Sequence, residues 1–147
     1  MEVGFSLATS HSASDVVLSG IRKARNCIDV AAYSFPSKQI ATALVAAKRR
    51  GVSVRVVTDE KANYDRYTAV TFLANQGVPV RLNGQYAIMH NKFMVIGDVT
   101  VQTGSFNYTA SAVSRNAENV LLIKDVPELA ATYLGEFNRP WTESENW

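Results

Sequence analysis

Apolar residues along the chain fall into two alternating patterns. Short apolar runs typical of buried strands occupy residues 3–7, 28–35, 52–58, 78–82, 93–96, 99–101 and 118–123. Between them, apolar residues at helical spacing predict helices that begin near residues 12, 37, 67, 107 and 127. Strands that alternate with helices in this order indicate an α/β fold, with a mixed, mostly parallel β-sheet sandwiched between helices.

Local signals place several helix ends. Ser12 is followed three residues later by Asp15, which is capping-box spacing, and Ser37 stands ready to cap the second helix. Gly51 is suited to end that second helix, and Pro127 to open the last one, which is expected to run to about residue 138. Its expected inward residues are Leu129, Tyr133, Leu134 and Phe137.

The runs at 93–96 and 99–101 flank Gly97 and Asp98, a pattern that predicts a hairpin with a two-residue turn. If the strand begins at His90, then His90 and Lys92 point to the same face, because side chains alternate along a strand. An imidazole and an ammonium on one face are unusual for a core. They suit a site that handles phosphate.

Composition narrows the class of protein. The chain has 147 residues, which predicts a single domain spanning 1–147, and its formal net charge of +2 is too small to argue for nucleic-acid binding by itself. The one cysteine, Cys27, excludes an intramolecular disulfide and is expected to be a small buried residue on the first helix. No Cys/His cluster has zinc-ligand spacing, and no apolar run approaches the length of a membrane span.

Hydrolysis of a phosphodiester without metal requires a nucleophile, an acid for the leaving oxygen and groups that hold the phosphate oxygens. His90 is the candidate nucleophile, and Lys92 shares its face. Ser105 and Asn107 follow a glycine that permits close approach of a ligand, so they are candidate phosphate-binding residues together with Lys92. Glu118 heads the next strand and is the candidate that orients His90.

A second histidine is missing from this set. The only other one, His11, lies in a Ser-rich stretch far upstream, where an exposed polar role is favoured over a catalytic one. A two-fold symmetric homodimer would instead supply a second copy of His90, because such an interface brings one surface patch against itself. The chemistry therefore implies a homodimer whose two histidines face each other.

The joint spacing of His90-x-Lys92 and Gly104-Ser105-x-Asn107 resembles the signature of the phospholipase D superfamily. A single copy of the motif in a short chain is similar to the small bacterial endonucleases of that superfamily. The resemblance extends to residues 32–35, 44–52, 103–109 and 118–119. It implies a homodimeric endonuclease that acts on single- and double-stranded DNA, and on RNA, with low sequence specificity and without a metal or other cofactor.

The resemblance also implies roles for residues. His90 of one subunit would form a phosphohistidine and His90 of the other would be the acid, while Lys92 and Asn107 would bind phosphate oxygens. Ser105 would assist in the site, and Glu118 would orient His90. Such proteins are often periplasmic or secreted, with the leader removed; a cytoplasmic protein is the alternative.

One position departs from the family's pattern. Gly97 stands where the motif has an aspartate, and the nearest carboxylate, Asp98, is one residue late. This departure leaves open a phosphate- or nucleic-acid-binding relative with weakened catalysis. The same chemistry also leaves open a lipid phosphodiesterase acting on cardiolipin or another phospholipid. Stacking groups for a nucleic-acid binder could come from Tyr64, Tyr67 and Tyr86.

Overall fold

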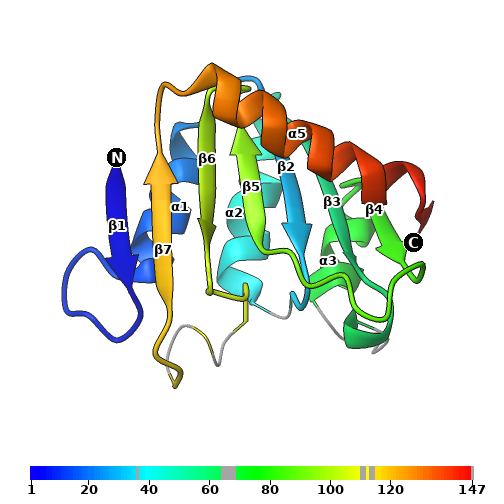
Figure 1. Cartoon of the computed structure of the whole chain (residues 1–147), viewed down its shortest axis with the longest axis horizontal. Coiled ribbons are helices and arrows are strands. Elements are labelled where there is room, and N and C mark those ends of the chain that lie inside the picture. Colours follow the sequence, from blue (N-terminus) through cyan, green and yellow to red (C-terminus); the bar gives the residue numbers. More distant parts are fainter. Residues whose placement is uncertain (36, 64–68, 110–111, 113–114, 147) are drawn as a thin grey trace.

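The fold is built on one eight-stranded sheet (Figure 1), in a computed structural model that describes residues 1–35, 37–63, 69–109, 112 and 115–146. The strands are β1 (Glu2–Phe5), β2 (Cys27–Ala32), β3 (Ser53–Asp59), β4 (Val80–Asn83), β5 (Phe93–Ile96), β6 (Thr100–Gly104), β7 (Asn119–Ile123) and β8 (Glu145–Asn146). Their order across the sheet is β1-β7-β6-β5-β2-β3-β4-β8. The helices are α1 (Ala13–Lys23), α2 (Lys38–Arg49), α3 (Ala69–Asn75) and α5 (Pro127–Thr142), with a short 3-10 helix, η1, at Lys61–Asn63.

Helices cover both faces of this sheet, which confirms the α/β sandwich expected from the sequence. Figure 1 shows α1, α2 and α3 on one face and α5 crossing the other. The sheet is mixed, but it is not mostly parallel. Among the described strands, only the β2–β3 and β3–β4 pairs are parallel, and the other pairs are antiparallel. The expectation failed because β5 and β6 form a hairpin and β7 returns beside β6, so these strands need no parallel crossover.

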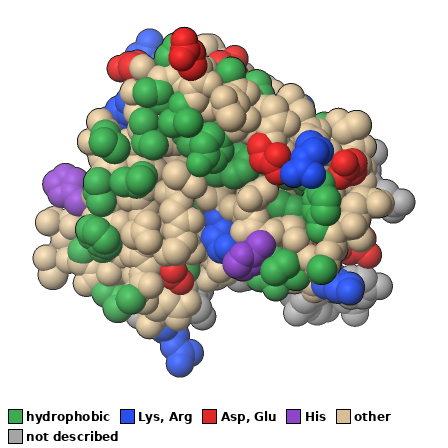
Figure 2. Space-filling view, in the orientation of Figure 1, with side chains coloured by type: hydrophobic (Ala, Val, Ile, Leu, Met, Phe, Trp, Pro, Cys, Tyr) green, Lys and Arg blue, Asp and Glu red, His purple; other side chains and the backbone are tan. Residues whose placement is uncertain are grey.

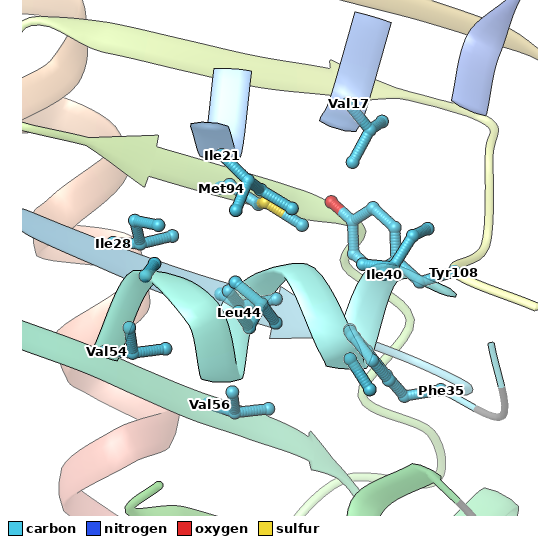
Figure 3. Close-up of a cluster of buried hydrophobic side chains, with 14 of the residues drawn as sticks. Val17, Ile21, Ile28, Phe35, Ile40, Leu44, Val54, Val56, Met94 and Tyr108 are labelled. Atoms are coloured by element: carbon cyan, nitrogen blue, oxygen red, sulfur yellow. The ribbon is translucent and has the colours of Figure 1, made fainter. Parts of the chain in front are cut away.

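Side chains of the central strands divide between two hydrophobic cores. On β2, Ile28 and Val30 belong to the core under α1 and α2, whereas Ala31 belongs to the core under α5. On β5, Met94 and Phe93 divide in the same way. Figure 3 shows the first of these cores, between the sheet and the helices. Strands buried on both faces explain the nearly continuous apolar runs in the sequence.

The helix ends follow the local signals. Ser12 Oγ accepts a hydrogen bond from the Asp15 N–H at 3.1 Å, and Ser37 Oγ accepts one from the Ile40 N–H at 3.4 Å, so both predicted caps are confirmed. The predicted inward residues of α5, namely Leu129, Tyr133, Leu134 and Phe137, all pack into the second core. This helix continues to Thr142 and contains Pro140, and the sequence did not predict its last turn or β8 after it.

The β5–β6 hairpin is confirmed, with two differences. Ile96 pairs with Thr100, so the turn has three residues rather than two, and Gly97 and Asp98 both have positive φ, at 62° and 61°. The strand begins at Phe93, so His90 and Lys92 lie in the segment just before it and not on the strand itself.

Cys27 also differs from expectation. It is the first residue of β2 rather than part of a helix, and it is only half-buried. Its Sγ donates to Asp98 Oδ1 at 3.6 Å. The predicted helices at 67–75 and 107–116 lie partly outside the described residues, as does the start of the second helix at Pro36. Within the described residues, no helix is long and apolar enough to cross a membrane.

The first core gives a stability prediction. Leu44 of α2 is fully buried, and Figure 3 shows it between the helix and the strands. Leu44→Ala is expected to lower the free energy of unfolding by about 2–5 kcal/mol, because it removes buried apolar contacts and leaves a cavity. Urea denaturation measures the change. Gln39→Ala, at an exposed position of the same helix, is the control and should stay within about 0.5 kcal/mol of the parent. Equal losses in both variants would contradict the assignment.

Candidate active site

The segment before β5 is fixed to the end of β3 by a buried carboxylate. Asp59, the last residue of β3, is 3% exposed. Its Oδ1 accepts a hydrogen bond from the Met89 N–H at 2.8 Å, and its Oδ2 accepts one from the Ala62 N–H at 3.0 Å. A buried carboxylate is stable only when hydrogen-bond donors satisfy it, so losing the contact between Asp59 and the Met89 N–H would be costly. This contact fixes the backbone one residue before His90.

A second buried polar residue fixes the loop that follows β2. Asn63 Oδ1 accepts from the Phe35 N–H at 3.0 Å, and Asn63 Nδ2 donates to Tyr33 O at 2.8 Å and to Thr58 Oγ1 at 2.7 Å. The Tyr33 ring then lies edge-on against the His90 imidazole, with ring centroids 4.9 Å apart. The ends of β2 and β3 thus support the histidine from two sides.

His90 and Lys92 are in direct contact, whereas the sequence predicted only that their side chains point to the same face. Lys92 Nζ lies 3.3 Å from both ring nitrogens of His90 and donates to the His90 backbone carbonyl at 2.8 Å. Partial burial lowers the pKa of Lys92, and the nearby carboxylate of Glu118 offsets part of this shift. The His90 side chain is exposed, so an anion can reach both groups.

Ser105 and Glu118 form the other half of the site. Gly104 has a φ of 150°, and a side chain there would place its Cβ 2.2 Å from the Asn119 carbonyl oxygen, so this position requires glycine. The close approach brings Ser105 Oγ within 2.7 Å of Glu118 Oε1, to which it donates. The Asn119 N–H donates to the same hydroxyl at 3.1 Å. Asn107 Oδ1 is buried and has no hydrogen-bond partner among the described residues.

The structure brings most of the predicted site residues together, but Glu118 does not pair with His90 as expected. Glu118 contacts Ser105 and acts on Lys92 electrostatically, and no hydrogen bond joins it to the imidazole of His90 in the same chain. The orienting role of Glu118 therefore stays a prediction. His11 is exposed, with a φ of 50°, in the loop before α1.

Gly97, the departure from the motif, lies at the far end of β5 from His90. The strand between them, which has four residues, is by itself roughly 13 Å long. Asp98 is therefore too distant to replace a carboxylate at the histidine. Its side chain accepts from Cys27 at the beginning of β2.

A cleft of about 420 Å³ opens beside His90 and Lys92. Figure 2 shows a hollow on this face where a histidine lies next to a cationic side chain. The lining residues are His90, Asn91, Lys92, Phe93, Thr103, Gly104, Thr132, Tyr133 and Glu136. The three from α5 were not among the predicted site residues, because their helical spacing indicates only which face of the helix is apolar. Tyr33 and Asp59 were missed because the sequence does not show that β2 and β3 end beside β5.

The cleft is not an evident metal site. Among the described side chains, no three from His, Cys, Asp and Glu lie close enough together to hold a metal ion. The Lys92 ammonium lies 3.3 Å from the His90 ring and is a cation that can face an incoming anion.

Comparison with known proteins gives one family. The family described as "Cardiolipin synthase, PLD-like domain" matches residues 17–141. Among solved structures, the chain is similar to Nuc from Salmonella typhimurium, a phospholipase D family member, with 39% identity, a TM-score of 0.94, and coverage of 99% of this chain and 96% of that one. Two curated relatives are a phospholipase D of Rickettsia prowazekii and the mitochondrial cardiolipin hydrolase of Mus musculus.

The two curated relatives are longer than this chain. The Rickettsia protein is 38% identical over 87% of this chain, and the mouse protein 33% identical over 94% of it. The chain spans 62% of the length of each. The family match covers most of the chain and the structural match to Nuc covers almost all of it, so the chain belongs to the phospholipase D superfamily.

Proposed function

We propose that the protein is a metal-independent phosphodiesterase that hydrolyses DNA, and also RNA, with low sequence specificity, as a homodimer. The observation that carries this proposal is the contact of 3.3 Å between the Lys92 ammonium and the His90 imidazole at the mouth of an open cleft. An ammonium beside a nucleophile holds the phosphate oxygens as negative charge shifts onto them.

The reaction follows from these groups in two steps. A ring nitrogen of neutral His90 attacks phosphorus, so that a P–N bond forms and the P–O bond to the leaving alcohol breaks. The leaving oxygen takes a proton from the imidazolium of a second His90. Water then attacks the phosphohistidine and gives its proton to that second imidazole, which breaks the P–N bond and restores both histidines.

Similarity to Nuc supports nucleic acid as the substrate. The two chains match over almost their whole lengths, and the single motif in a short chain resembles the small bacterial endonucleases of the superfamily. Lipid hydrolysis is the second candidate, because two curated relatives are named phospholipase D and cardiolipin hydrolase. Polar groups on the cleft wall, from Asn91, Thr132 and Glu136, suit a nucleotide better than an acyl chain.

The homodimer is supported by an exposed apolar surface that reaches the site. Val3 and Phe5 of β1 are 46% and 59% exposed, because α5 packs over β2 to β6 and leaves β1 and β7 open. Figure 2 shows hydrophobic side chains gathered on the part of this face where Figure 1 places β1 and β7. Phe5 pairs with Asn119, whose side chain donates to Ser105 Oγ at 3.2 Å. A second copy that covers Phe5 therefore stands beside the site.

One experiment tests both metal independence and the role of His90. We expect plasmid DNA to be cleaved in EDTA, and His90→Asn to lower the rate by at least about 10³-fold, because it removes both the nucleophile and the acid. His11→Asn is the matched control and should keep the parent's rate, since His11 is exposed and Asn tolerates its positive φ. Loss of cleavage in EDTA would contradict the mechanism.

Vesicles containing cardiolipin, assayed in parallel, test lipid hydrolysis, the second candidate function. Faster hydrolysis of lipid than of DNA would favour it.

The dimer has a separate test by sedimentation. We expect two chains per particle for the parent and one for Phe5→Asp, because a carboxylate on this apolar surface opposes its burial. Nuclease activity should fall by about 10²–10⁴-fold in the variant, the contribution of a lost general acid. Phe72→Asp, at an exposed phenylalanine of α3, should remain a dimer with full activity. A fully active single-chain particle would rule out the shared site.

Lys92 gives a pH dependence. An ammonium is charged below its pKa, and the pKa of Lys92 lies below the ordinary 10.5. Binding of inorganic phosphate, measured by calorimetry, is therefore expected to weaken at a lower pH than a free lysine would lose its charge. Lys92→Arg should keep its affinity over the same range, because a guanidinium is not deprotonated there. Constant affinity of the parent up to pH 10.5 would contradict the assigned role.

A further inference from the structure

The α5 wall of the cleft carries a carboxylate where a site for polyanions needs none. Glu136 faces the cleft together with Thr132, one turn earlier on the helix. Its Oε1 lies 3.5 Å from Asn91 Nδ2, next to His90 in the chain. An acceptor-only group cannot donate to phosphate oxygens, so its position in the cleft suits a ligand group that donates hydrogen bonds.

Arg139 hydrogen-bonds to the Glu136 carboxylate in the absence of substrate. Arg139 Nη2 donates to Glu136 Oε1 at 2.6 Å, and Arg139 Nε donates to Oε2 at 3.3 Å. Arg139 is itself fixed, because its Nη1 donates to Tyr86 Oη at 3.0 Å and Tyr86 donates to Glu143 at 2.5 Å. A group that is oriented in advance loses little entropy when it binds a ligand.

The chemistry of the Glu136 carboxylate indicates which kind of ligand group it can bind. A carboxylate only accepts hydrogen bonds, so its ligand must present an N–H or O–H. The guanidinium of Arg139 donates to both carboxylate oxygens of Glu136. Each oxygen can still accept a hydrogen bond from a donor in the cleft. The cleft volume of about 420 Å³ is within the range of small-ligand sites. A base that enters it must leave the stack, so the substrate is single-stranded there.

We propose that Glu136 is a specificity-determining residue that accepts a hydrogen bond from the exocyclic amino group of an unstacked base next to the scissile phosphate. Cytosine, adenine and guanine carry such a group. Thymine has no amino group, and its one ring donor, N3–H, lies between two carbonyl oxygens that the carboxylate repels. The inference rests on the proposed nuclease function and adds a preference to it.

Two oligonucleotides of equal size test the preference. The parent protein should cleave single-stranded oligo-dC with a kcat/KM about tenfold above that for oligo-dT, the effect of one hydrogen bond to a charged group. Glu136→Gln should bring the ratio close to one, because an amide can donate to thymine as well as accept from cytosine. Bis(4-nitrophenyl) phosphate, which has no donor, should be cleaved by the variant at least as fast as by the parent.

Glu128→Gln is the matched control, since Glu128 lies in the first turn of the same helix, outside the cleft. It should keep the tenfold ratio. A parent ratio near one, or an equal change on all three substrates in Glu136→Gln, would overturn the inference while the nuclease function stands. Cleavage of bis(4-nitrophenyl) phosphate without cleavage of either oligonucleotide would instead overturn the nuclease function.

Discussion

The antiparallel pairing of β5 with β2 is the constraint on which the site depends. Ala31 pairs with Phe93, so the chain leaving β2 meets the chain entering β5 at one edge of the sheet. This register puts Tyr33, just past β2, against His90, just before β5. β3 runs parallel to β2 and ends at the same edge, where Asp59 binds the Met89 N–H. The histidine is therefore positioned by three strands, although it belongs to none of them.

The features that could be predicted from the sequence are those determined by residues close together in the chain. Features that depend on contacts between distant segments could not be predicted. The caps at Ser12 and Ser37 and the hairpin around Gly97 were predictable, because neighbours within a few residues determine them. The balance of parallel and antiparallel pairs was not, because it depends on which distant strands meet. Cys27 was misplaced for a related reason: an apolar residue at helical spacing is also compatible with the first position of a strand.

The residues of the site also divide into those that local spacing predicts and those that come from distant segments. His90, Lys92 and Ser105 were predictable because their spacing within one stretch carries the chemistry. Asp59 and Glu136 come from segments 31 and 46 residues away from His90, and no spacing rule connects them to it. Glu118 shows the limit within the motif itself. Its position predicted a carboxylate at the site, but spacing could not determine whether it binds a hydroxyl or an imidazole, and in the single chain it binds the hydroxyl of Ser105.

The width of the sheet explains why one edge of its α5 face is left uncovered, which is the surface on which the proposed homodimer depends. Eight strands span about 34 Å, whereas the 16 residues of α5 extend over about 24 Å. The helix therefore cannot cover the whole face, and the part that it leaves open is the edge formed by β7 and β1. That edge carries the exposed Val3 and Phe5, and at the end of β7 it carries Glu118 beside Ser105. In the proposed homodimer, a second chain on this edge would bury the apolar side chains and would bring a second imidazole and a second carboxylate to the first, so the same interface would serve both the hydrophobic surface and the chemistry.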